Sequence, residues 1–266
     1  MPNHITNRLT VKAEGERLEE ILAAIQNDSI GRGSIDFNKL IPMPESLNIQ
    51  SGSETNRAIS AYLTALNPHT PDMRYAKIEY AKLQELQNRL NSSKMFGEFQ
   101  CGMSRQELAD AAQYRPIEDV LELGKTAVDN FLQYGSIDWY HWCNKNWGTK
   151  WNAYGYEDVS APPAGNVLTY LTAWDGIPKL VAVLSSRFPD VEFQYEYADE
   201  DVGFNVGRMD FLNGETVYEN IPDAHSKEAY EMAFDIMHCT ADSYNLAFDE
   251  KAQTYQYQEE MGMQME

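Results

Sequence analysis

The feature that most constrains this fold is a change of hydrophobic period along the chain. Residues 1–50 and 136–248 mix strand-like alternation with helical stretches, whereas residues 51–135 carry helical periods alone. The pattern therefore predicts a helical insertion between two halves of a sheet. The remaining residues, 249–266, are rich in Gln, Glu and Met, which predicts a flexible tail.

The first half of the sheet is predicted within residues 1–50. Residues 4–12 alternate loosely, as a strand does, and residues 16–28 carry apolar side chains at the spacing of an amphipathic helix. Residues 35–41 are then expected to form a second strand, which Pro42 ends because proline cannot donate to a β-ladder. Strand, helix and strand together make the first half of a split βαβ unit.

The insertion at 51–135 is predicted to hold three or four helices. The first follows Ser53 or Thr55, which are capping candidates. Another begins at Ser104, with a glutamate three residues later, as in a capping box. The last is framed by Pro116 at its start and Gly135 just past its end, which is the usual asymmetry of helix termini.

The second half of the sheet is predicted within residues 136–248. An aromatic segment containing 146–154 is expected to be a strand, followed by a strand at 167–174 and a short helix at 177–189. A half-buried strand at 191–197 precedes one or two more strands that turn at Asn213–Gly214, and a helix spans 226–248. The fold class is α+β: a ferredoxin-like antiparallel sheet of split βαβ units, helices on one face, an all-helical insertion and a C-terminal helix.

Charge is distributed unevenly along the chain. Residues 1–156 have 19 acids and 16 bases, whereas residues 157–266 have 22 acids and 5 bases, so the second part carries −17 of the total −20. The electrostatic field of this negative charge repels nucleic acid and attracts basic surfaces. An excess of acidic residues also simply keeps proteins soluble. Direct nucleic-acid binding is therefore not expected. The absence of an apolar run of membrane-spanning length argues against a membrane protein.

The cysteines and the N-terminal sequence bear on the compartment. Three cysteines are widely spaced and odd in number, which indicates reduced thiols rather than a disulfide framework. The first residues lack the apolar stretch of a signal peptide. A cytoplasmic location is expected.

Several segments of the sequence are distinctive when taken together: MPNHITNRLTV, IDFNKLIPMPE, NWGTKWNAY, LTAW with IPKLVAVLSSRFP, and YADEDVGFNVG. Together they resemble a family of uncharacterised phage and plasmid proteins that carry a ferredoxin-like domain of the YubB type. The resemblance implies a ferredoxin-like fold and residence on mobile genetic elements inside bacterial cells. It implies no activity and no cofactor.

The segment NWGTKWNAY offers one candidate site. If it is a strand, Lys150, Asn152 and Tyr154 share one face, while Trp147 and Trp151 share the other. Aromatic residues at this spacing are usually core. Alternatively, Lys150 holds an anion, Asn152 and Tyr154 hydrogen-bond to a ligand, and Asp199 or Asp201 acts as base or metal ligand.

The acidic second part offers the other candidate site. Its carboxylates would stand in for the phosphates of nucleic acid on a basic partner protein. The candidate residues are Glu192, Glu196, Asp199, Glu200, Asp201, Asp210, Glu228, Glu231 and Asp235.

Other site chemistry finds little support in the sequence. The row Asp199, Glu200, Asp201 does not follow the EF-hand pattern, and the histidines and cysteines lack zinc-site spacing, so no metal is expected. Pairing of Cys143 with His141 as nucleophile and base lacks a supporting motif. We therefore expect a non-catalytic acidic binding protein of a mobile element that mimics a nucleic acid in a basic groove of a host defence protein. The alternative is a small-ligand binder or enzyme using the polar face of NWGTKWNAY. The oligomeric state stays open.

Overall fold

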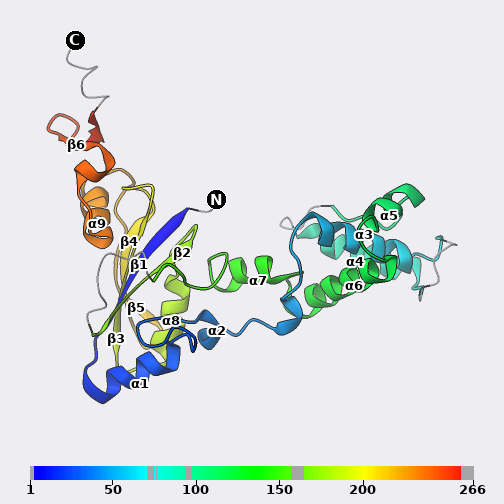
Figure 1. The fold of residues 1–266 in the computed structure, drawn as a ribbon, viewed down its shortest axis with the longest axis horizontal. Coiled ribbons are helices and arrows are strands. Elements are labelled where there is room, and N and C mark those ends of the chain that lie inside the picture. Colours follow the sequence, from blue (N-terminus) through cyan, green and yellow to red (C-terminus); the bar gives the residue numbers. More distant parts are fainter. Residues whose placement is uncertain (1–2, 71–74, 76, 94–97, 157–164, 259–266) are drawn as a thin grey trace, which may run out of the picture. The chain divides into compact units, whose positions relative to one another are not determined.

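The computed structural model describes residues 3–70, 75, 77–93, 98–156 and 165–258 (Figure 1). They divide into two compact units, one made of residues 1–42 with 144–266 and the other of residues 43–143. The helical unit is thus wider than the predicted 51–135. The reason is local packing: Ser46 donates a hydrogen bond to Asn130 of the long helix α6 (Ile117–Tyr134), at 2.6 Å between Oγ and Oδ1.

The α+β unit is built on a five-stranded antiparallel sheet with the strand order β2-β1-β3-β4-β5. The strands are β1 (His4–Val11), β2 (Val167–Ala173), β3 (Glu192–Asp199), β4 (Val206–Leu212) and β5 (Glu215–Asn220). Helix α8 (Pro178–Arg187) connects β2 to β3, and β1 lies between these two strands. This is a split βαβ unit, and it confirms the predicted ferredoxin-like fold class.

Helices cover both faces of the sheet, not one face as expected (Figure 1). On one face, the Tyr195 hydroxyl donates to the Asn7 side chain and accepts from the backbone N–H of Ile177, which caps α8. On the other face, Arg8 reaches Asp235 of α9 (Lys227–Met237). Neighbouring side chains in a strand point to opposite faces of the sheet. Asn7 of β1 therefore points to the face on which α8 lies, and Arg8 points to the face on which α9 lies.

The hairpin between β4 and β5 turns where the sequence predicts it. Asn213 and Gly214 have φ values of 50° and 82°, and they form the two-residue turn. Both residues of such a turn need positive φ, which Asn and Gly tolerate best. The adjacent strand β3 was also predicted, and its Phe193 and Tyr195 are buried as expected. The predicted half-buried alternation is wrong beyond Tyr195, because Glu196 and Ala198 are buried as well.

Two other segments differ from the prediction. Residues 35–41 form the short helix α2 (Phe37–Leu40), in which the Asp36 side chain accepts from the N–H of Asn38. Helix α1 (Gly15–Ile25) precedes it as expected. The predicted helix at 226–248 ends at Met237, because His238 takes a left-handed conformation.

A 3-10 helix η2 (Ala241–Tyr244) and a two-stranded hairpin follow α9. The hairpin pairs β6 (Leu246–Asp249) with β7 (Thr254–Tyr257), so part of the predicted flexible tail has regular structure. Tyr255 packs on Tyr230 and Phe234 of α9, with ring centroids 5.5 and 5.3 Å apart, which anchors the hairpin. Residues 259–266 lie outside the described residues.

The second unit is helical, as predicted. Its elements are η1 (Glu45–Leu47), α3 (Ser53–Leu66), α4 (Tyr80–Ser92), α5 (Arg105–Ala111) and α6, with α7 (Trp139–Asn146) running across the unit boundary. The capping box of Ser104 and Glu107 forms, and Gly135 ends α6 in the left-handed conformation. By contrast, α3 is capped by Gly52 and uses neither Ser53 nor Thr55 as a side-chain cap.

Candidate functional site

The NWGTKWNAY segment does not form the predicted strand. Helix α7 continues to Asn146, Gly148 turns the chain at φ 80°, and only Tyr154 makes an isolated β-bridge, with Leu171 of β2. The predicted division of its side chains into two faces is therefore wrong. Aromatic side chains at a spacing of two fit an irregular segment wound against the sheet as well as they fit a strand.

Most of the polar side chains in this segment hold the fold together. The Asn152 side chain accepts from the N–H of Phe37 and donates to Asp36 at 2.6 Å, which fixes the start of α2. The Tyr154 hydroxyl lies 2.7 Å from His4 Nδ1 and donates to the carbonyl of Thr172. Trp147 is buried, and its indole N–H donates to the carbonyl of Ile41.

Among the polar side chains of this segment, Lys150 has the surroundings that suit a ligand-binding residue. Its ammonium group lies 4.5 Å from the ring centroid of Trp151 and 5.2 Å from that of Trp174. Trp174 is 39% exposed and has φ 75°, a left-handed backbone that bulky residues rarely adopt. Trp174 and His4 were not among the residues predicted from the sequence. Because Trp174 closes a predicted strand, nothing in the sequence pointed to its ring.

The nine acidic candidates separate into buried and exposed groups. Asp199, Glu196 and Asp210 are buried, at 2%, 7% and 5% exposure. Asp199 accepts from the N–H of Asp201 and from Asn3, so it shapes the loop after β3. Burial raises the pKa of Asp199 above its usual value, and those hydrogen bonds oppose the rise.

The other two buried carboxylates are paired with arginines. Arg8 binds Glu196 through Nε and Nη2 at 2.8 and 3.0 Å, and Arg208 binds Asp210 through Nε and Nη2 at 3.1 and 2.7 Å. Burial alone would lower the pKa of Arg8, but its hydrogen bonds to Glu196 and Asp235 outweigh that effect and raise it. Both carboxylates are thus neutralised within the protein and are poorly placed to imitate phosphates.

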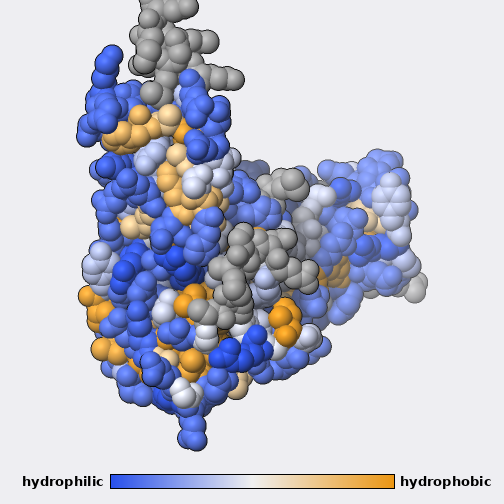
Figure 2. All heavy atoms as spheres, turned by 60° about the vertical axis from the view of Figure 1, so that its left-hand side comes forward, coloured by the Kyte–Doolittle hydropathy of each residue, from blue (hydrophilic) through white to orange (hydrophobic). Residues whose placement is uncertain are grey.

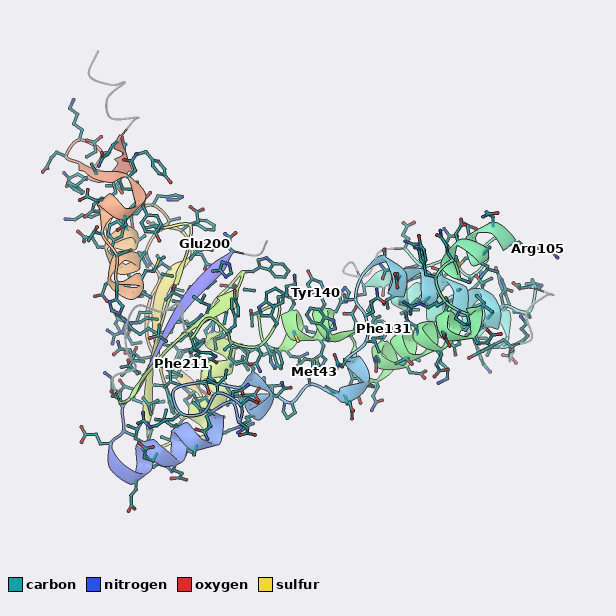
Figure 3. The ribbon with its side chains drawn as sticks, in the orientation of Figure 1. Met43, Arg105, Phe131, Tyr140, Glu200 and Phe211 are labelled. Atoms are coloured by element: carbon teal, nitrogen blue, oxygen red, sulfur yellow. The ribbon has the colours of Figure 1, made fainter. Side chains whose placement is uncertain are left out.

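Five exposed candidates gather around α9 and the loop after β3. Glu228, Glu231 and Asp235 lie three and four residues apart, so they form one acidic stripe on the side of α9 away from its buried Ala229 and Ala233. The loop that carries Glu200 and Asp201 meets the start of α9, where the N–H of His225 donates to the carbonyl of Gly203. Figure 3 places Glu200 at the end of the sheet, and Figure 2 shows hydrophilic side chains over much of this face, interrupted by separate apolar patches.

The exposed candidates are only lightly engaged. Glu228 accepts from Asn220 at 2.8 Å, Glu231 lies 3.7 Å from Lys227, and Asp235 shares Arg8 with Glu196. Glu192, the ninth candidate, stands at the opposite end of β3 from Asp199 and does not join this group. We use the name α9 acidic surface for Glu200, Asp201, Glu228, Glu231 and Asp235.

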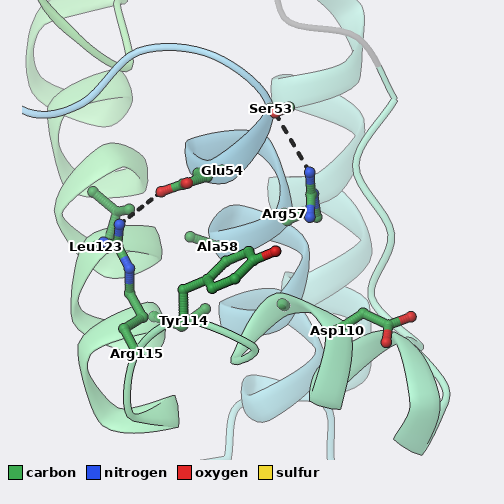
Figure 4. Close-up of a pocket in the computed structure, with 10 residues that line it drawn as sticks. Ser53, Glu54, Arg57, Ala58, Asp110, Tyr114, Arg115 and Leu123 are labelled. Carbon is green, nitrogen blue, oxygen red and sulfur yellow. Dashed lines mark hydrogen bonds and ion pairs between the residues drawn. The ribbon is translucent and has the colours of Figure 1, made fainter.

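The helical unit contains a cavity that was not predicted from the sequence (Figure 4). Its volume is about 100 Å³, and Arg57, Tyr114 and Arg115 are among its lining residues. Arg115 is paired with Glu54 at 2.6 Å, and Arg57 lies within hydrogen-bonding distance of Ser53. With Glu54 and Asp110 also in the wall, the cavity has no consistent charge that would select a ligand.

Metal binding and nucleophilic chemistry find no geometric support among the described residues. No group of three or more His, Cys, Asp or Glu side chains in that part of the chain is arranged to hold a metal ion. His141 is hydrogen-bonded to Asp138 at 2.7 Å, while burial raises the pKa of the Cys143 thiol to about 12. A thiol with that pKa is a poor nucleophile at neutral pH. Across the same residues, no helix has both the length and the apolar character to cross a membrane.

The sheet, its split βαβ connection and the helices on its two faces define a ferredoxin-like α+β domain. Residues 147–240 match a family model described as the ferredoxin-like domain in Api92-like protein. Among solved structures, the chain is similar to the protein api92 from Yersinia pseudotuberculosis, with 11% identity over 84% of this chain and 99% of that chain and a TM-score of 0.35. No curated protein matches the chain.

Proposed function

We propose that the α+β unit is a non-catalytic binding module whose α9 acidic surface takes up a basic surface of a partner protein. The partner would be a nucleic-acid-binding protein, for example one of a host defence system. The carboxylates would occupy the groove in which that protein binds nucleic acid. We also propose that the chain comes from a mobile genetic element and is located in the bacterial cytoplasm. These two points rest on the family resemblance.

The observation that carries the proposal is the acidic stripe on α9. Side chains three or four residues apart on a helix are about 5–6 Å from one another. Glu228, Glu231 and Asp235 therefore present a row of closely spaced charges, with Glu200 and Asp201 on the adjoining loop. A basic groove meeting this row would release its bound anions, as it does on binding nucleic acid.

Affinity capture from a bacterial lysate tests the proposal, with elution on a salt gradient and with double-stranded DNA as competitor. We expect a basic nucleic-acid-binding protein that DNA displaces and that rising salt releases steeply. The triple variant Glu228→Lys, Glu231→Lys, Asp235→Lys should lose it. The matched control reverses three exposed charges of the helical unit, Glu85→Lys, Glu98→Lys and Glu122→Lys, and should retain it.

Two results would contradict the proposal. Equal loss in both triple variants would mean that net charge, not the α9 acidic surface, governs binding. A captured protein that resists both DNA and high salt would exclude mimicry. The simplest remaining explanation of the acidity would then be solubility.

A second candidate function uses Lys150, with Trp151 and Trp174 beside it, to bind a small anionic ligand. The specific observation in its favour is the pair of indole rings around Lys150, one of them on a left-handed backbone. Nucleotides are suitable probes because they combine an aromatic ring with negative charge. Quenching of tryptophan fluorescence by a nucleotide, lost in Lys150→Ala, would favour this function; the absence of quenching would remove it.

A further inference from the structure

The two edges of the sheet differ. At the β2 edge, Leu171 exchanges backbone hydrogen bonds with Tyr154, at 2.7 and 3.1 Å, so part of this edge is already covered. At the other edge, β5 pairs with β4, and no second strand pairs with it among the described residues. The side chains from Glu215 to Glu219 are all exposed, including Val217 at 53% and Tyr218 at 46%.

The register shows which backbone groups of β5 face outward. Leu212 and Glu215 close the two-residue turn, and residues in that position are joined by a hydrogen bond. In an antiparallel pair the next residues, Phe211 and Thr216, form a pair without hydrogen bonds. The N–H and C=O of Thr216 therefore point away from β4 toward the open edge, where an added strand could pair with them.

The charges at this edge indicate the chemistry of the added strand. Glu215 and Glu219 flank the exposed Val217 and Tyr218. A second copy of this chain would bring its own glutamates and a net charge of −20 to the same place, which disfavours self-pairing. An extended segment that alternates basic and apolar residues would pair its backbone with β5 and its side chains with the carboxylates and apolar groups.

We propose that the β5 edge, residues 215–220, binds an extended basic segment of the partner protein by β-strand addition. This deepens the proposed function, on which it rests, by naming how a basic partner is recognised in addition to the α9 acidic surface. Strand addition derives affinity from the backbone and specificity from alternate side chains. The irregular register between Asp210 and Phe211, which opposes Val217, limits how many residues can pair continuously.

Fluorescence anisotropy with the full chain at low salt tests the proposal. The probe is a labelled octapeptide of alternating lysine and valine, and its comparison peptides are an alternating glutamate–valine octapeptide and the same lysine–valine peptide with alternate backbone nitrogens methylated. We expect binding of the lysine peptide and no binding of the glutamate peptide. Methylation keeps the charge but removes backbone donors, and it should weaken binding about tenfold.

Variants of the protein locate the binding. Thr216→Pro removes an outward N–H that edge strands can do without, and it should weaken the lysine peptide about tenfold. Glu219→Lys on β5 should weaken it more than Glu231→Lys on α9, although both reverse one exposed charge. When the lysine peptide is added to the unaltered chain, hydrogen exchange should slow in residues 215–220. This measurement keeps the test valid if Thr216→Pro does not fold.

Three outcomes would overturn strand addition. If the methylated peptide binds as well as the unmodified one and Glu231→Lys has the larger effect, the partner docks on α9; the proposed function would then survive without the β5 edge. If light scattering finds a dimer that Thr216→Pro dissociates, a second copy occupies the edge. If the lysine peptide does not bind, the β5 edge is not a docking strand. The proposed function is then tested separately, by affinity capture from the lysate.

Discussion

Replacing Arg8 by methionine should strongly destabilise the α+β unit, because Arg8 is the charge partner of a buried glutamate. The side chains of Arg8 and Glu196 are 17% and 9% exposed, and they are joined by two short hydrogen bonds. Breaking a buried ion pair from one side costs about 3–5 kcal/mol, since the remaining charge stays buried. Nearby Arg208 also interacts with Glu196, so we expect about 3 kcal/mol, the lower end of that range.

Two further variants test the physical reason. The double variant Arg8→Met, Glu196→Leu removes both charges, and it should recover stability to within about 1 kcal/mol of the unaltered chain. Asp235→Asn removes the exposed partner of Arg8, which is 69% exposed, and should cost less than about 1 kcal/mol. The matched comparison thus separates loss of a buried pair from loss of a surface contact.

Native-state hydrogen exchange is the suitable assay, because amides of β1 and β3 report the opening free energy of this unit separately from the helical unit. A loss of less than about 1 kcal/mol in Arg8→Met would refute the burial of an unpaired charge as the cause. A double variant less stable than Arg8→Met alone would also refute it.

Three other predictions follow from single positions. Gly124→Ala should destabilise the helical unit by about 1–3 kcal/mol, measured by urea denaturation, because an added Cβ would lie 2.1 Å from the carbonyl oxygen of Ala58; a neutral result would mean that α3 and α6 can move apart. Cys143, with its pKa of about 12, should alkylate more slowly at pH 8 than the half-buried Cys101, as peptide mass spectrometry would measure. Because burial raises the native pKa of Asp199, stability should fall as pH rises from the unfolded to the native pKa, and Asp199→Asn, which keeps the acceptor, should remove that fall in thermal unfolding. A variant with an unchanged pH profile would contradict the last prediction.

Signals within a few residues predicted the local structure well. The Asn213–Gly214 turn, the Ser104–Glu107 capping box and the end of α6 at Gly135 all form as expected. Each depends on backbone angles or hydrogen bonds between residues close in the chain, so the sequence carries the whole cause. Burial on alternate positions of β1 likewise follows from the strand period, whereas β3 is buried at consecutive positions from Tyr195 to Asp199.

Two segments were predicted wrongly because distant residues decide their conformation. Phe37 begins a helix, not a strand, as its N–H donates to Asn152 and its neighbour Asp36 accepts from the same side chain. That contact also holds the NWGTKWNAY segment out of a regular strand. An apolar period cannot reveal a hydrogen bond between residues more than a hundred positions apart.

The sequence by itself determined the fold class, the helical insertion and the concentration of acidic residues after residue 156. Tertiary structure decided which of those acids face the solvent. Glu196 is neutralised by Arg8, 188 positions earlier in the chain, whereas Glu228 and Glu231 remain exposed on α9. A carboxylate becomes buried only where folding brings it a charge partner or enough hydrogen bonds, and those partners are set by the order of the strands in the sheet.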